Sequence, residues 1–269
     1  MSMPASLMLV GAGKMGGAML AGWLDAGLDP AATTVIDPAP SEAMARLCTD
    51  RGVTLNSSDP IPAAVLVLAI KPQGLEAAAP GLDRLIGPGT LLVSVLAGKT
   101  VSDLRGRLPQ ARAVVRAMPN LPASIGHGAT GAYANAEASE SQRASADALL
   151  SASGTVAWLE DEALIDSVTA VSGSGPAYVF LMVETLAEAG IEAGLPPNVA
   201  MRLARATVAG AGALLDADPT GAGALRQAVT SPGGTTAAAL QVLMAGDGMA
   251  PLMRRAVAAA KRRAGELSG

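Results

Sequence analysis

The stretch SLMLVGAGKMGGAMLAGWLDAG, residues 6–27, decides the fold. Its apolar start, 6–10, predicts a buried strand, and 15–27 has the apolar spacing of a helix. The segment that joins them, GAGKMG at 11–16, fits the pattern G-x-G-x-x-G that opens dinucleotide-binding folds. Because a strand precedes this pattern and a helix follows it, the context indicates a nucleotide site more strongly than the pattern alone.

Each glycine of this turn has a physical task. Gly11 permits the tight turn, Gly13 lets the backbone approach a pyrophosphate, and Gly16 lets the helix and strand pack closely. The helix N-terminus then faces the phosphate charge. A glycine-rich turn without a ligand is the alternative. We expect the whole turn to bind a cofactor: Gly11, Ala12, Gly13, Lys14, Met15 and Gly16.

Strand and helix patterns alternate through the first 160 residues. The almost entirely apolar strands predict a sheet covered on both faces, and the alternation predicts parallel βαβ units. Ser41 is the expected N-cap of the second helix. Further strands are expected at 33–37, 64–70, 89–98, 111–118, 129–135 and 154–160, and further helices at 41–52 and around 139–152.

After Glu160 the pattern becomes helical without a convincing strand. The fold class is therefore α/β, with an N-terminal Rossmann-type domain at 1–160 and an all-helical domain at 161–269. Several of these helices are apolar around most of their circumference, which favours burial in an intertwined homodimer. Helices are expected at 161–171, 176–194, 197–216, 220–229, 235–245 and 249–266.

Composition excludes several function classes. The net charge is −4, and the only basic run is KRR at 261–263, which argues against a nucleic-acid partner. No apolar run reaches the length of a membrane span, about 20 residues, and the N-terminus lacks a secretory signal. A single cysteine, Cys48, fits a reducing cytoplasm, and one cysteine with one histidine leaves no metal cluster. We expect a soluble cytoplasmic protein without a metal.

Two further segments are expected to border the nucleotide, the end of the second strand and the loop after the third strand. Asp37 ends the second strand, where an acidic side chain accepts hydrogen bonds from ribose hydroxyls and favours NADH; capping of the Asp-Pro turn is the alternative. Arg46 could reach the 2′-phosphate of NADPH, so that cofactor stays open. The residues after the third strand lie where open α/β sheets bind ligands: Ala69, Ile70, Lys71 and Pro72. Lys71 could equally be a solvated loop lysine that does not contact the cofactor.

Two small-residue segments interrupt the helical part. TSPGGTT at 230–236 leaves backbone amides free at a helix start, where a small carboxylate could dock; a capped helix connector is the alternative. In AVSGSGPAYVF at 170–180, the glycines would let the backbone approach another chain or a planar ring, unless they only kink a buried helix.

Taken together, these segments resemble the pyrroline-5-carboxylate reductase family. They occur in the family's order and cover nearly the whole chain, and TSPGGTT is the family's most distinctive signature. The segments that carry the resemblance are GAGKMG, AIKPQ (69–73), SVLAGKT (94–100), RAMPNLPASIGHGAT (116–130), VSGSGPAYVF (171–180) and TSPGGTT with its trailing AAALQVL.

The resemblance implies reduction of 1-pyrroline-5-carboxylate to L-proline, the last step of proline biosynthesis, with NADPH or NADH. It also implies homodimers formed through the helical domain, which can assemble further into a decamer. In the family, the active site lies between the cofactor domain of one subunit and the helical domain of its partner.

The resemblance also assigns roles by position. Thr236 would hydrogen-bond the nitrogen side of the substrate ring and is the expected catalytic residue, and Glu162 would approach the substrate. Ala97 and Pro176 would border the nicotinamide. Asn56 and Asn120 would help hold the cofactor. The amides of the signature turn would bind the substrate carboxylate, giving the expected substrate-binding set Glu162, Ser231, Gly233, Gly234, Thr235 and Thr236.

Two departures and two rival readings accompany this assignment. Leu121 stands where the family usually has a threonine, and His127 where it often has an acidic residue. A β-hydroxyacid dehydrogenase would share both domains, but it relies on a helical-domain lysine, and no lysine lies between 100 and 260. A non-catalytic NAD-binding sensor would not need a carboxylate turn.

Overall fold

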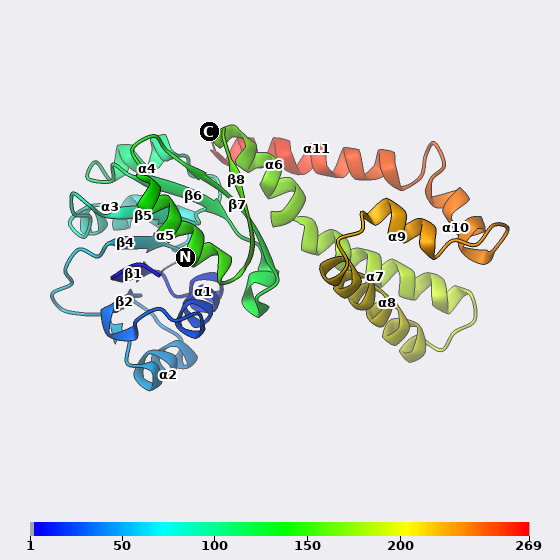
Figure 1. Ribbon diagram of the computed structural model, residues 1–269, viewed down its shortest axis with the longest axis horizontal. Helices are drawn as coiled ribbons and strands as arrows, with labels where there is room; N and C mark the ends of the chain where they lie inside the picture. The colour runs from blue at the N-terminus through cyan, green and yellow to red at the C-terminus, as the bar shows by residue number, and fades with distance from the viewer. Residues whose placement is uncertain (1–2, 269) are drawn as a thin grey trace. The chain divides into compact units, whose positions relative to one another are not determined.

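Two units make up the computed structural model, which describes residues 3–268 (Figure 1). The first unit comprises the chain up to Gly173 together with the segment from Ala260, and the second is Ser174–Ala259. The division comes later in the chain than the expected boundary near residue 160. The reason is that 161–173 packs with the first unit, where Ile165 and Ala170 are buried.

An eight-stranded sheet forms the centre of the first unit, in the order β3-β2-β1-β4-β5-β6-β7-β8. The order reverses beside β1, and this reversal is the topological switch point at which such sheets bind ligands. The strands are β1 (Leu7–Val10), β2 (Thr33–Ile36), β3 (Thr54–Leu55), β4 (Val65–Leu68), β5 (Leu91–Ser94), β6 (Val114–Met118), β7 (Gly128–Ala134) and β8 (Gly154–Leu159).

The alternation of strands and helices predicted a parallel sheet, but one pair of strands in the structure is antiparallel. The first six strands in the sheet order, from β3 at the edge to β6, pair in parallel. Strand β7 pairs antiparallel with β6, and β8 pairs parallel with β7. The connection 119–127 between β6 and β7 holds only the short 3₁₀ helix η3 (Leu121–Ile125). A parallel neighbour needs a crossover of a dozen or more residues, so this short connection returns the chain antiparallel.

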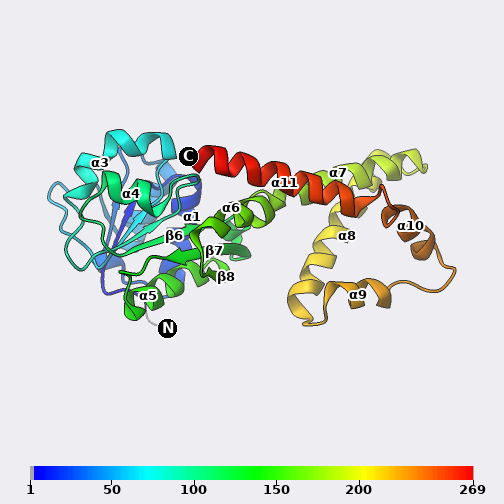
Figure 2. The ribbon, with the colours of Figure 1, turned by 90° about the horizontal axis from the view of Figure 1, so that it is seen from above.

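Helices cover both faces of the sheet, as the apolar strands predicted. Alternate residues of β1 serve opposite faces: Leu7 and Leu9 pack with α1, α2 and α5, whereas Met8 and Val10 pack with α3 and α4. Figure 2 shows α3 and α4 on one side of the sheet and α5 on the other. These helices are α1 (Lys14–Asp25), α2 (Glu42–Arg51), α3 (Leu75–Asp83), α4 (Val101–Arg107) and α5 (Glu140–Ser151).

Local signals explain where several helices begin. The Ser41 hydroxyl accepts from the Met44 N–H at 3.2 Å, which confirms the expected N-cap of α2, and Ser139 caps α5 in the same way. Helices α3 and α4 were not expected. The reason lies in their sequences, because Pro80 sits inside α3 and Gly106 inside the seven-residue α4.

After β8, three short helical pieces complete this part of the first unit: the 3₁₀ helix η4 (Glu162–Leu164), α6 (Ile165–Val168) and the π-helix η5 (Thr169–Gly173). Such π-turns occur frequently at functional sites. Helix α6 packs on β6 and β7.

The second unit is helical, as expected. Helices α7 and α8 pack side by side, and the described side chains that are buried here are small: Ala187, Ala200 and Ala204. Large apolar side chains such as Phe180 and Leu215 are exposed instead. The helices are α7 (Gly175–Glu192), α8 (Pro197–Ala217), α9 (Ala222–Ala228), α10 (Thr235–Leu243) and α11 (Met249–Ser268), the last of which ends within the first unit. Over the described residues, none of the helices combines the length and apolar character that crossing a membrane requires.

Candidate active site

The glycine-rich turn joins β1 to α1 and is held by close backbone packing. Gly11 has a positive φ of +89°, and a Cβ there would lie 2.8 Å from the backbone of Ala69. A Cβ on Gly16 would lie 2.1 Å from the Gly11 carbonyl oxygen. Both positions therefore exclude any side chain, and the backbone of the turn packs against Ala69 directly after β4.

Gly13 is different, because it faces open space. It precedes α1 as the N-cap, and no heavy atom lies within 4 Å of the position a Cβ would take. The first amides of α1 have no intrahelical acceptor, because the helical bonds begin with Gly17 N–H donating to the Gly13 carbonyl at 2.8 Å. The chain thus presents unhindered N–H groups beside an open space, which suits a pyrophosphate.

A groove of about 610 Å³ continues from this turn towards α2, within the size range of small-molecule sites. Its charged lining residues are Lys14 and Asp37. The full lining is Ala12, Gly13, Lys14, Gly17, Ala18, Asp37, Ala39, Ser41, Ala43, Met44 and Leu47.

The Asp37 carboxylate links β2 to the glycine-rich turn. Its Oδ2 accepts from the Ala12 N–H at 2.7 Å, and its Oδ1 accepts from the Ala39 N–H at 2.9 Å. The second bond is the turn-capping contact that was the alternative reading, and it coexists with a position in the groove. Each oxygen keeps a further lone pair with which to accept a ribose hydroxyl.

Asn56 holds the backbone of Asp37 from the neighbouring strand end. Its Oδ1 accepts from the Asp37 N–H at 2.9 Å, and its Nδ2 donates to the Asp37 carbonyl at 2.8 Å. Asn56 itself has a positive φ of 53°, a conformation that asparagine tolerates better than most residues. Arg46 pairs with Glu42 on the exposed surface of α2.

The loop after β4 contains the other expected cofactor contacts. Ala69 donates its N–H to the Val10 carbonyl at 2.8 Å, so this loop begins beside the glycine-rich turn. Ile70 is half-buried and Lys71 is exposed, and Pro72 opens the 3₁₀ helix η2 (Pro72–Gly74). These residues therefore lie at the carboxyl edge of the sheet.

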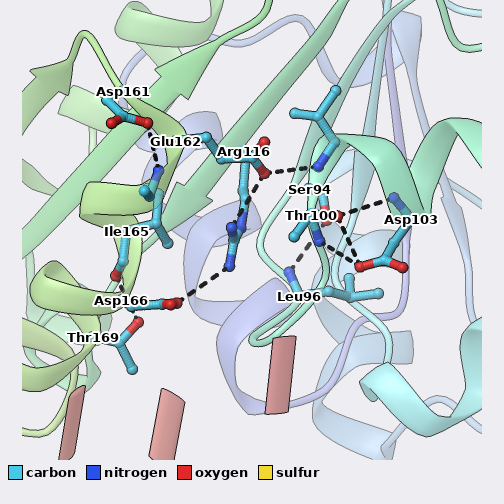
Figure 3. Close-up of polar contacts among 12 residues, drawn as sticks. Ser94, Leu96, Thr100, Asp103, Arg116, Asp161, Glu162, Ile165, Asp166 and Thr169 are labelled. Atoms are coloured by element: carbon cyan, nitrogen blue, oxygen red, sulfur yellow. Dashed lines mark hydrogen bonds and ion pairs between the residues drawn. The ribbon is translucent and has the colours of Figure 1, made fainter. Parts of the chain in front are cut away.

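An ion cluster with a buried arginine at its centre lies at the same edge, beyond β5 and β6 (Figure 3). The Arg116 side chain is only 5% exposed; its Nη1 lies 3.1 Å from Glu162 Oε1, and its Nη2 lies 4.0 Å from Asp166 Oδ1. Glu162 Oε1 also accepts from the Val101 N–H at 2.7 Å. Arg116 was not among the residues expected at the site, although a charged residue inside an apolar strand signals a partner in the fold.

A capping box fixes the start of α4 within the same network. The Thr100 hydroxyl accepts from the Asp103 N–H, and Asp103 Oδ2 accepts from the Thr100 N–H, each at 3.0 Å. Burial by itself would raise the pKa of Asp103, but the hydrogen bonds from Thr100 and the charges of Lys99 and Arg107 outweigh it and lower that pKa. Ala97, in the loop before α4, is exposed at the edge of the sheet.

Asn120 uses its amide to join protein segments. It is buried, its Nδ2 donates to the Ser172 carbonyl at 3.0 Å, and its Oδ1 accepts from the Ala129 N–H at 2.9 Å. The amide thereby ties the π-helix η5 to the start of β7. Leu121 and His127, where the chain departs from the family pattern, are both exposed.

The signature turn lies in the second unit, between α9 and α10. Gly233 has a positive φ of +70°, and Gly234 donates its N–H to the Ser231 carbonyl at 3.0 Å. Helix α10 begins at Thr235 and has no side-chain cap. Among residues 3–268, the N–H groups of Thr235 and Thr236 have no hydrogen-bond acceptor. The Gly234 amide is therefore engaged in the turn, whereas the next two remain available to a ligand.

The remaining expected residues are placed as follows. Pro176 occupies the first turn of α7 and is half-buried. Thr236 is half-buried, and Ser231 and Thr235 are exposed. Over residues 3–268, no group of three or more histidine, cysteine, aspartate or glutamate side chains could hold a metal ion.

The switch-point sheet, the open glycine-rich turn and the helical second part define a dinucleotide-dependent oxidoreductase of the Rossmann type. Residues 6–98 match the family model described as "NADP oxidoreductase coenzyme F420-dependent". Residues 162–267 match "Pyrroline-5-carboxylate reductase dimerisation". The chain belongs to the pyrroline-5-carboxylate reductase family, because it is 40% identical over 262 residues to the pyrroline-5-carboxylate reductase of Pseudomonas aeruginosa.

That alignment covers 96% of this chain and 95% of the Pseudomonas protein. A solved pyrroline-5-carboxylate reductase from Coxiella burnetii is 34% identical and superposes with a TM-score of 0.91 over 98% of each chain. The NADP-bound Plasmodium falciparum pyrroline carboxylate reductase, 23% identical with a TM-score of 0.79 over 100% of each chain, shares the fold.

Proposed function

We propose that this protein reduces 1-pyrroline-5-carboxylate to L-proline, the last step of proline biosynthesis, with NADH or NADPH. The observation that carries the proposal is the signature turn, whose free N–H groups at Thr235 and Thr236 begin a helix. These donors, with the positive end of the helix dipole, suit a small carboxylate. A protein that only sensed a dinucleotide would not need them.

The chain's own groups would bind and orient the substrate. The amides of Gly233, Thr235 and Thr236 would hold the carboxylate, beside Ser231 and the Gly234 turn. The Thr236 hydroxyl would orient the ring nitrogen. The imine accepts a hydride readily only when protonated, and a cationic nitrogen is favoured beside the bound carboxylate. An unperturbed hydroxyl is a poor acid, so Thr236 would aim the imine and not act as a strong proton donor.

The cofactor half of the site fits a nicotinamide dinucleotide. When bound, such a dinucleotide supplies the hydride. The open space at Gly13 and the amides of α1 would hold its pyrophosphate, and Ala97 and Pro176 would border its nicotinamide. Much of the barrier reduction would come from positioning, which can be worth about 7–11 kcal/mol.

Cofactor choice would lean towards NADH. Asp37 places a carboxylate in the groove where a 2′-phosphate would otherwise enter, and Arg46 is paired with Glu42 on the surface of α2. Like charges near a protein surface repel by about 1–4 kcal/mol at 4 Å. NADPH would therefore bind less well at this position than NADH.

Assembly would complete the site. The second unit buries few side chains of its own and exposes large apolar ones, including Phe180, Leu186 and Leu215. Exposed apolar surface of this extent marks an interaction site. We place the homodimer interface here, with the partner's helical domain bringing its signature turn to the cofactor domain; a decamer of such dimers would be the larger assembly. Cytoplasmic location would fit the single, buried Cys48.

One assay tests the reaction. Purified protein is mixed with 1-pyrroline-5-carboxylate and either NADH or NADPH, and the loss of reduced cofactor is followed by its absorbance. Turnover with formation of proline is expected, faster with NADH. Protein that binds a cofactor but turns over neither would overturn the proposal. Sedimentation of the same sample tests for a dimer or larger assembly.

A further inference from the structure

The loop between β5 and α4, residues 95–100, is anchored at both ends. At its start, the Leu96 N–H donates to the Ser94 hydroxyl at 3.3 Å, and Val95 donates its N–H to the Leu68 carbonyl at 3.1 Å. At its end, the capping box of Thr100 and Asp103 fixes the first turn of α4 (Figure 3). Within residues 3–268, the structure shows no such side-chain anchor for the middle of the loop, around Ala97 and Gly98.

The middle of this loop lies against the end of α11. Gly98 has a positive φ of +69°, and a Cβ there would lie 2.7 Å from the Leu267 carbonyl oxygen and 3.2 Å from the Leu267 Cβ. The backbone and the Cβ of Leu267 in α11 thus lie against a residue that has no side chain. Since both elements belong to the first unit, the contact is internal to it.

The same helix end lies against the ion cluster. Ala264 is buried, and a Cβ on Gly265 would lie 3.6 Å from Asp166 Oδ2. Asp166 in turn faces Arg116 on β6. The segment 260–268 therefore touches two structures at the carboxyl edge of the sheet, the 95–100 loop and the ion cluster.

We infer that the end of α11, residues 260–268, is a positioning element of the cofactor site, which holds the 95–100 loop in place through Gly98. The carboxyl edge of an open α/β sheet is where a dinucleotide lies, and Ala97 is exposed there. This inference rests on the proposed use of a dinucleotide by this chain. Leu267 touches the loop and would not touch the ligand, so its role is one of positioning.

Direct binding of NADH, measured by its fluorescence, tests the inference without turnover. A chain that ends at Glu266 lacks the backbone that meets Gly98, and Gly98→Ala forces that backbone away. Both should raise the dissociation constant of NADH between about twofold and thirtyfold, the range of mutations that shift a coupled element. In steady-state assays the KM for NADH should rise while the KM for 1-pyrroline-5-carboxylate stays unchanged.

Two variants serve as matched controls. Gly52→Ala carries a similar backbone strain, φ +75°, but has no neighbour within 4 Å. Leu267→Ala keeps the carbonyl and Cβ that Gly98 meets. Both should bind NADH as the full chain does. Gly98→Ala made in the shortened chain should bind no more weakly than the shortened chain alone, because its clash has been removed.

Two results would overturn the inference: a shortened chain with full affinity for NADH, or equal losses in Gly98→Ala and Gly52→Ala. Thermal unfolding of each variant identifies any general loss of the fold. Failure of the full chain to bind either cofactor would instead count against the proposed function.

Discussion

The carboxylate of Asp37, at the end of β2, accepts a hydrogen bond from the Ala12 N–H in the glycine-rich turn, with 2.7 Å between N and O. A second backbone donor, the Ala39 N–H, occupies its other oxygen at 2.9 Å. One side chain thus fixes the nucleotide turn, caps its own loop and places a negative charge in the groove.

Asp37→Asn tests these roles together. An amide offers one acceptor oxygen, so either Ala12 or Ala39 would lose its partner, at a cost of about 1–3 kcal/mol in unfolding free energy. Loss of the charge should raise the NADPH-to-NADH ratio of kcat/KM by about tenfold, or 1.4 kcal/mol. Urea unfolding and paired kinetic assays measure the two effects. An unchanged ratio would show that Asp37 does not select the cofactor.

Gly13 and Gly16 should respond to alanine in opposite ways. Gly16→Ala places a methyl group 2.1 Å from the Gly11 carbonyl oxygen and should lower the unfolding free energy by about 1–3 kcal/mol. Gly13→Ala meets no neighbour within 4 Å, so its effect on stability should stay below about 1 kcal/mol. It should nonetheless weaken NADH binding by about tenfold or more, because the methyl group fills the pyrophosphate position. Tight binding by a folded Gly13→Ala protein would place the phosphate elsewhere.

Arg116 and Glu162 distinguish a structural role from a substrate role. Arg116→Met removes the charged partner of Glu162; because the Glu162 side chain is 24% exposed and keeps the Val101 N–H donor, the cost should be about 1.5–3 kcal/mol of stability. Glu162→Gln keeps an acceptor for Val101 and Arg116, so the loss should be smaller, about 1–2 kcal/mol. Chemical denaturation at fixed protein concentration measures both. If Glu162→Gln leaves stability intact but lowers kcat/KM for 1-pyrroline-5-carboxylate, its main contact is with the substrate.

Thr236→Ala should lower turnover without abolishing it. A hydrogen bond to a charged group is worth about 1.5–3 kcal/mol, which corresponds to a decrease of about 10–150-fold in kcat/KM. Thr236→Ser keeps the hydroxyl and should recover most of the activity. Thr220→Ala, in the loop before α9, removes a hydroxyl from the same unit and serves as the control. Complete inactivity of a folded Thr236→Ala protein that still binds cofactor would mean that the hydroxyl has a larger role.

Asp103 should make the protein sensitive to acid. Its pKa is lowered in the folded state from an ordinary value of 3.8, so its stabilising contribution is fully present above that value and is lost as the pH falls below it. Asp103→Asn should therefore be less stable than the original protein at pH 7 and should show a smaller loss of stability as the pH falls from about 4 to about 2. Urea unfolding across this range tests it. Parallel acid profiles would assign the sensitivity to other carboxylates.

Much of the first unit could be predicted because its signals are local. Apolar runs marked the strands, and Ser41 marked the start of α2. The spacing of the glycines predicted the tight turn, and the structure gives the physical reason for that pattern, because a Cβ at Gly11 or Gly16 has no room. The reversal at β7 was missed because strand direction depends on the connection 119–127, whose shortness was the overlooked signal.

The candidate site was harder to predict where it depends on distant residues. Asn120 and Asn56 were expected to help hold the cofactor, and the structure adds protein contacts of their amides, to Ser172 and Asp37 respectively, that no local pattern indicated. Arg116 meets Glu162 only because β6 and η4 lie together in the folded chain. Such pairings follow from tertiary structure, and a single sequence has no periodicity that reports them.

The order of the two units along the chain also bears on synthesis. Ser174–Ala259 is made before the segment from Ala260 that belongs with the first unit. Most of the nucleotide-binding unit would therefore emerge from the ribosome before the helical second unit is made. Leu267 can reach Gly98 only after residues 174–259 have been synthesised. Vectorial folding of this enzyme would thus end at the loop beside its cofactor, long after its glycine-rich turn had formed.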